Sequence, residues 1–294
     1  FNIALGDNAG TAITSGTTNI LLGYDAGGDL TTGSDNVAIG TYALNAEDEH
    51  GRNVAVGHET LGTLNAGAHG YNTGVGYFAG REITTGIENT IIGGLAGDAL
   101  TTGARNVAIG YHALGGEDAH GKNVAIGYQA LKVQDAGADA YNVAVGYSAG
   151  ENVSTGVQNT IVGGQAGDAI TEGTSNIFVG YQAGSALTIG NGNVAIGKAS
   201  LATSVDGDNN TAIGHQALNV YEGGDGEGSN TAVGKNAGLS VSTGQDNTLL
   251  GANAGDAITT GINNIVIGKN AAASAVGVNN EITLGDSNIS AIRA

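Results

Sequence analysis

The sequence contains no cysteine, proline, methionine or tryptophan, and aromatic residues make up only 4% of its 294 residues. Without cysteine, disulfides play no part in the fold and the redox compartment cannot be inferred. The absence of proline suits a chain whose backbone N–H groups serve a sheet ladder. No apolar run is long enough to span a membrane, so we expect no membrane insertion.

Positive charge is also scarce, with 9 Lys and Arg against 27 Asp and Glu and a formal net charge of −18. This balance disfavours nucleic acid and anionic membranes as partners and favours solubility or cation binding. So few basic residues also disfavour a polysaccharide lyase or hydrolase, and we expect no enzymatic activity. The chain begins at Phe1 without a signal peptide, so we expect it to be a segment of a longer protein.

Glycine is abundant (Gly 54) and disfavours helix. It lacks the strict third-residue period of collagen, and the regular apolar positions exclude a disordered linker. The dominant pattern is Asn-Val-Ala-Ile-Gly, first complete at Asn36–Gly40 and repeated through the chain. Most copies follow one another at the same step, which is the one from Asn19 to Asn36 and again from Asn36 to Asn53. A fixed short period of this kind is typical of a solenoid.

A longer period lies on top of the first, because residues 36–105 match residues 106–175 almost position for position. Asn36 corresponds to Asn106 in this match, and the shift spans four coils. We therefore predict an all-β protein, a parallel β-solenoid or β-roll of about 17 coils with a 70-residue superperiod. The repeat shaft is expected over residues 1–279, and a terminal coil and junction over residues 280–294.

Each coil is numbered here from its asparagine, position 0. Position +3 is a bulky aliphatic residue, +4 is glycine, +7 is nearly always alanine, and many coils have an aliphatic residue at +11 followed by Thr or Ser and Gly. This pattern predicts two short strands joined by two turns in each coil. Stacked asparagines can form a hydrogen-bonded ladder and glycine suits the turn, so we assign a structural ladder. Its representative residues are Asn36, Asn53, Asn106, Asn123, Gly40 and Gly110.

Position +2 is apolar in most coils, although side chains alternate along a strand and +2 must face away from +1 and +3. Both faces of the strand are therefore apolar, and the pattern leaves open which of them lies inside the coil. The other face requires a cover, and further copies around a symmetry axis would supply it. We assign an oligomer interface to the +2 column, represented by Leu21, Ile91, Ala108, Ile161, Phe178 and Leu249.

The repeat, as at Asn36-Val-Ala-Ile-Gly40, resembles the head repeat of trimeric autotransporter adhesins. It is closer to the Asn-Thr-Ala-Ile-Gly repeats of bacteriophage tail fibres, matched at Asn210–Gly214. The segment Asn280–Ala294 is similar to the one that precedes the self-cleaving endosialidase-type intramolecular chaperone of tail fibres and tailspikes. The resemblance implies a left-handed β-roll, a homotrimer, and an extracellular place on a virion tail fibre, although the coil is longer than is usual among the adhesins. It also implies a host cell-surface receptor, for which a glycan is one candidate.

Two loops combine carboxylates with histidine at equivalent positions of the repeat, Glu47–His50 and Glu117–His120. Such loops can bind a divalent cation, although a solvated turn is the commoner arrangement. Asp206, Asp208 and Asn210 begin like a calcium loop but lack its glycine and its distal glutamate, and the Asp225–Glu227 segment is similarly weak. We therefore assign no cofactor and no metal site, with a divalent cation as the alternative.

Loops that break the period carry Tyr71, Tyr141 and Tyr221, which are candidates for receptor contact through stacking on sugars. The simpler alternative is that they pack over the edge of the coil. A bacterial surface adhesin is the runner-up function. An ice-binding solenoid is a third, suggested by paired threonines such as Thr31-Thr32 and Thr84-Thr85, but the coils at Asn36 and Asn53 lack the pair.

Overall fold

The computed structural model describes residues 1–223, 228–289 and 291, in two compact units, residues 1–148 and 149–294. The described residues form a parallel β-solenoid of about 17 turns and no helix. Its period is the one predicted, since consecutive strands usually begin at equivalent positions of the repeat, as Val37 and Val54 do. The predicted all-β solenoid is thereby confirmed. None of the described residues belongs to a helix that could cross a membrane.

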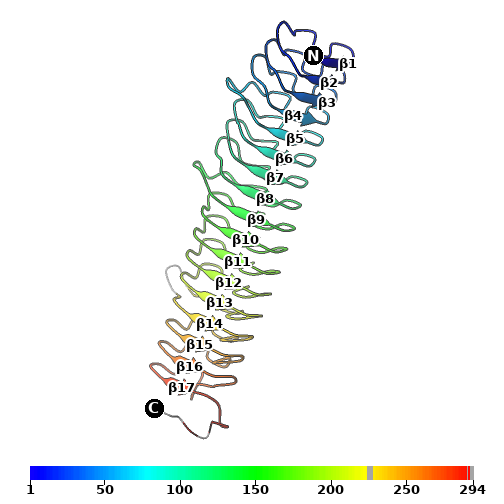
Figure 1. Ribbon diagram of the computed structural model, residues 1–294. Helices are drawn as coiled ribbons and strands as arrows, with labels where there is room; N and C mark the ends of the chain where they lie inside the picture. The colour runs from blue at the N-terminus through cyan, green and yellow to red at the C-terminus, as the bar shows by residue number, and fades with distance from the viewer. Residues whose placement is uncertain (224–227, 290, 292–294) are drawn as a thin grey trace. The chain divides into compact units, whose positions relative to one another are not determined.

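Each coil contributes one strand of three residues, and within each unit the strands stack in chain order (Figure 1). The strands of the first unit are β1 (Ile3–Leu5), β2 (Ile20–Leu22), β3 (Val37–Ile39), β4 (Val54–Val56), β5 (Thr73–Val75), β6 (Thr90–Ile92), β7 (Val107–Ile109), β8 (Val124–Ile126) and β9 (Val143–Val145). Those of the second are β10 (Thr160–Val162), β11 (Ile177–Val179), β12 (Val194–Ile196), β13 (Thr211–Ile213), β14 (Thr231–Val233), β15 (Thr248–Leu250), β16 (Ile265–Ile267) and β17 (Ile282–Leu284).

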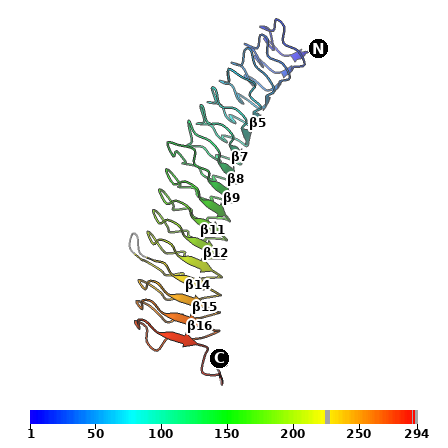
Figure 2. The same ribbon diagram turned by 60° about the vertical axis from the view of Figure 1, so that its left-hand side comes forward.

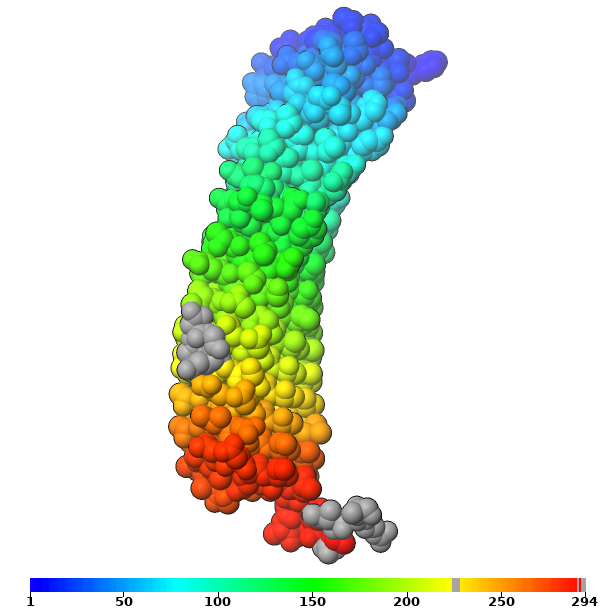
Figure 3. Space-filling view, turned by 90° about the vertical axis from the view of Figure 1, so that its left-hand side faces the viewer, coloured from blue at the N-terminus to red at the C-terminus, as the bar shows by residue number. Residues whose placement is uncertain are grey.

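Neighbouring strands pair in parallel with equivalent positions opposite each other, as Ala38 of β3 lies opposite Ala55 of β4. This register converts each position of the repeat into a column of like residues along a unit. In Figure 2 the strands of each unit line one side of the coils and the turns lie on the other. In the space-filling view the colours of each unit advance in sequence order, as expected when each coil contacts only its neighbours (Figure 3).

The second strand predicted for each coil is not formed among the described residues, where turns and bends occupy that part of the period. Backbone hydrogen bonds still join neighbouring coils in that part of the period, but they do not form the regular ladder of a β-sheet. The N–H group of Thr84, for example, donates to the carbonyl oxygen of Thr101 over 2.8 Å. Threonine side chains add to this contact, because the Thr84 hydroxyl donates to the same oxygen.

The recurrent asparagines from Asn19 to Asn264 are buried, and they bond each coil to the next. The Oδ1 atom of Asn36 accepts the N–H group of Asn53, and Oδ1 of Asn106 accepts that of Asn123, both over 3.0 Å. The Nδ2 group donates to a carbonyl oxygen at the far end of its own coil, as from Asn106 to His120. One amide such as that of Asn106 thus closes its coil and also joins it to the neighbour, so both of its polar atoms have partners. Asn123 differs, because its buried Nδ2 atom has no hydrogen-bond partner among the described residues.

The glycine at +4 is required by two independent constraints. Gly40 and Gly110 both have φ of +135°, which L side chains rarely adopt. A Cβ atom on either residue would also lie only 2.3 Å from the carbonyl oxygen of the equivalent glycine in the next coil. These glycines therefore set how closely the coils can stack.

Candidate functional site

The strand face that was predicted to form the oligomer interface, position +2, points into the coil and not outward. All six side chains assigned to it, Leu21, Ile91, Ala108, Ile161, Phe178 and Leu249, are fully buried inside a single chain. A side chain enclosed by its own coil offers no surface to a partner, so this assignment is wrong. The +2 column instead forms the core together with the alanines at +7.

The outward face of the strands consists of positions +1 and +3, and it is also apolar. In β7 these residues are Val107 and Ile109, which are partly exposed on either side of the buried Ala108. In β16, Ile265 and Ile267 are each 37% exposed. Valine, isoleucine, leucine or threonine occupies these positions in every strand. Each unit therefore presents a continuous aliphatic surface, here called the outward stripe.

A row of exposed tyrosines at position +5 follows the strands of three neighbouring coils. The rings of Tyr111 and Tyr128 stack with centroids 5.6 Å apart, and those of Tyr128 and Tyr147 with centroids 5.1 Å apart. The three side chains are 47%, 42% and 59% exposed. We call them the tyrosine row. Sequence reasoning missed it, although counting residues at +5 in consecutive coils would have found it.

The three tyrosines predicted in loops differ in position. Tyr71 and Tyr141 are exposed, and their hydroxyls accept hydrogen bonds from Arg52 and Lys122, at 2.6 Å and 2.9 Å. Tyr221 is fully buried in the +11 column of the core, so its prediction as a receptor contact is wrong. Its ring packs where other coils have an aliphatic side chain, which a pattern read from loop length does not reveal.

The core columns at +8 and +11 vary together. Where +8 is glycine, as at Gly97, +11 is aliphatic, as at Leu100. Where +8 is leucine, as at Leu114, +11 is variable. Its residues in those coils are Glu47, Leu64, Glu117, Gln134, Ser204 and Tyr221, all fully buried. The leucine supplies core volume and leaves +11 open to other chemistry.

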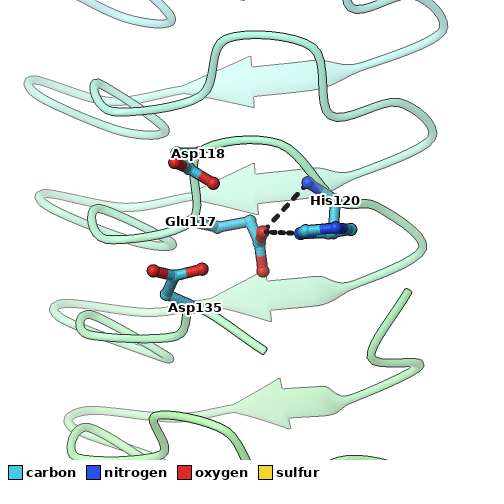
Figure 4. A group of neighbouring side chains, drawn as sticks. All are labelled: Glu117, Asp118, His120 and Asp135. Atoms are coloured by element: carbon cyan, nitrogen blue, oxygen red, sulfur yellow. Dashed lines mark hydrogen bonds and ion pairs between the residues drawn. The ribbon is translucent and has the colours of Figure 1, made fainter. Parts of the chain in front are cut away.

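Two of these buried residues are glutamates at the centre of acidic clusters. The Glu117 cluster comprises Glu117, Asp118, His120 and Asp135, whose candidate ligand atoms all lie within 4.8 Å of one another (Figure 4). The Glu47 cluster comprises Glu47, Asp48 and His50, equally close together. These clusters contain the Glu47–His50 and Glu117–His120 loops noted in the sequence, and the structure adds Asp135 from the next coil.

The carboxylate of Glu117 is only partly satisfied. Its Oε1 atom accepts the backbone N–H group of His120 over 3.0 Å and lies 3.5 Å from the Nδ1 atom of that residue. Its Oε2 atom and the Nδ1 atom of His120 are buried and accept or donate no hydrogen bond among the described residues. Burial raises the pKa of Glu117, partly offset by the His120 N–H group, and burial raises the pKa of Glu47 in the same way.

The other candidate cation loop is used for hydrogen bonding instead. Asn210 belongs to the asparagine ladder, where its Oδ1 atom accepts the N–H group of Asn230. The carboxylate of Asp208 accepts the backbone N–H group of Asn191 in the preceding coil. Neither Asp206 nor Asp208 belongs to a group of three or more neighbouring Asp, Glu, His or Cys ligands among the described residues. The Asp225–Glu227 segment lies entirely outside those residues.

No protein-family model matches this chain, and no curated protein is significantly similar to it.

Proposed function

We propose that this chain is the shaft of an extracellular, non-enzymatic fibre that assembles as a homotrimer and contacts a host surface. A bacteriophage tail fibre is the preferred identity, with a left-handed coil and a 70-residue repeating unit. The observation that carries the proposal is the outward stripe. Soluble monomers rarely leave so continuous an apolar surface in water, and copies of the same stripe around a threefold axis would cover it.

The tyrosine row supports the recognition part of the proposal. The three rings are partly exposed side by side, and such a cluster of tyrosines combines apolar ring surface with a polar hydroxyl, as contact surfaces for polar ligands do. Tyr71 and Tyr141 add two further exposed rings. A cell-surface glycan is therefore the receptor class that we favour.

A bacterial trimeric surface adhesin is the alternative, because it would use the same stripe in the same way. The two identities differ in what adjoins the repeats in the complete protein. A membrane anchor would indicate the adhesin, whereas a chaperone domain after residue 294 would indicate the tail fibre.

The test is the mass of the assembly in solution, measured by light scattering during size-exclusion chromatography. We expect three times the mass of one chain. The Ile109→Asp variant should lower that mass while retaining the β-rich circular dichroism spectrum, because the side chain points away from the core. The matched control is Ala138→Asp, in an exposed loop, which should remain trimeric. A parent chain that is monomeric and soluble would refute the proposal.

A further inference from the structure

Glu117 is a carboxylate in a column that most coils use for an apolar core side chain. The equivalent residues in the two preceding coils are Leu100 and Ile83, both fully buried and aliphatic. A buried carboxylate is unfavourable unless it is paired, hydrogen-bonded or bound to a metal. Glu117 receives one backbone hydrogen bond on Oε1, and Oε2 has none among the described residues. The fold alone therefore leaves this charge incompletely compensated.

The surrounding donors have the geometry of a single ion site. Metal–ligand distances of about 2.0–2.6 Å place ligands on opposite sides of an ion roughly 4–5 Å apart. The four side chains of the Glu117 cluster can each supply one atom within 4.8 Å of the others. Figure 4 shows Glu117 between the imidazole of His120 on one side and Asp118 and Asp135 on the other.

We propose that the Glu117 cluster binds a divalent transition-metal cation of the Zn²⁺ class. The imidazole nitrogen favours Zn²⁺ and similar ions, whereas Ca²⁺ and Mg²⁺ prefer oxygen ligands only. Asp118 and Asp135 are exposed, so an ion can reach the site from solvent. Because Asp135 belongs to the coil after that of Glu117, the ion also joins two neighbouring coils.

The repeat supplies a natural comparison. In the Glu47 cluster the position equivalent to Asp135 is Asn65, which removes one anionic ligand. In the coil that starts at Asn193, the equivalents of Glu117 and His120 are Ser204 and Gly207. That coil keeps its ladder bond, from Asn193 Nδ2 to the Gly207 carbonyl oxygen at 2.8 Å. The solenoid therefore does not require glutamate and histidine at these positions, which points to a role other than folding.

The experiment is a Zn²⁺ titration of the 294-residue chain after treatment with a chelator, followed by calorimetry and by direct measurement of bound metal. We expect one tighter site, the Glu117 cluster, and one weaker site, the Glu47 cluster. The Glu117→Gln variant keeps the size of the side chain and has a precedent in the buried Gln134 of the next coil. It should retain the fold and lose the tighter site.

Three further substitutions test which side chains bind the ion. Asp135→Asn should weaken the tighter site by at least the roughly tenfold that loss of a supporting group costs at metal sites. Asn65→Asp should strengthen the weaker site by a comparable factor. His120→Ala should weaken Zn²⁺ binding while leaving the backbone carbonyl of residue 120 in place.

The proposal is overturned if the parent chain binds no Zn²⁺, or if Glu117→Gln and His120→Ala bind it as tightly as the parent chain. Binding of Ca²⁺ in preference to Zn²⁺, unchanged by His120→Ala, would also overturn it. Circular dichroism of each variant distinguishes loss of the ligand from loss of the fold. The site lies within one chain, so its test does not depend on the trimer.

Discussion

Two adjacent coils, residues 89–105 and 106–122, share their strand and the turn that follows it and differ in what their cores contain. Both begin with a ladder asparagine, and their strands β6 and β7 pair in register. The first places Gly97 and Leu100 at +8 and +11, whereas the second places Leu114 and Glu117 there. The comparison shows that a solenoid can place its apolar volume at +8 instead of +11, and so accommodate a buried polar group, while keeping the register of its strands.

The largest effect is expected when the glutamate is introduced into the wrong coil. Leu100→Glu should destabilise the protein by more than about 4 kcal/mol, because Gly97 supplies no core volume and Gly103 stands where His120 would be. Urea unfolding measures the loss. The control is Leu100→Ala, for which about 2–5 kcal/mol is typical. Equal losses for the two variants would show that the coil tolerates the charge.

An effect common to both coils comes next. Asn89→Ala and Asn106→Ala should each cost about 2–4 kcal/mol, because each leaves a buried N–H group and a buried carbonyl without partners. Each asparagine accepts the N–H group of the next one, over 2.9 Å and 3.0 Å respectively. Unfolding experiments on both variants should give similar losses. A much larger loss in one coil would mean that the ladder and the +11 residue are coupled.

A smaller effect of opposite sign is expected from restoring an aliphatic residue. In chelator-treated protein, Glu117→Leu should stabilise the fold by about 1–2 kcal/mol, since replacing buried charge with apolar volume is often favourable. Leu61 and Leu64 already occupy +8 and +11 together in another coil, so there is space for both. Thermal unfolding with and without Zn²⁺ measures the change. A lower melting temperature for the metal-free variant would contradict this expectation.

The smallest effect is a dependence on pH. Because burial raises the pKa of Glu117, the folded chain retains a proton that the unfolded chain has already released. The free energy of unfolding should therefore fall as pH rises from the ordinary glutamate pKa through the raised one, and then level off. The charges of Asp118, Asp135 and His120 act on the same group. Metal-free Glu117→Leu should show a shallower fall, and an identical pH profile would rule out this contribution.

Predictions from the sequence were confirmed where a residue type has a single structural role at its position in the repeat. The period, the parallel stacking and the absence of helix among the described residues follow from the regular Asn and Gly positions. The asparagine bonds between coils also agree with the ladder expected of stacked amides. The tyrosine row was missed because Tyr111, Tyr128 and Tyr147 stand just outside the repeated Asn-to-Gly motif, although each lies at position +5 of its coil.

The amino-acid sequence by itself determined the repeat, its length and the apolar character of both strand faces. Only the tertiary structure decided which face is enclosed, because alternation along a strand is the same whichever side is turned inward. The chain turns sharply at residues such as Gly40 and encloses the small Ala38, leaving Val37 and Ile39 outside. Likewise, only folding brought Asp135 beside Glu117, since ligands from different coils meet through stacking and not through nearness in sequence.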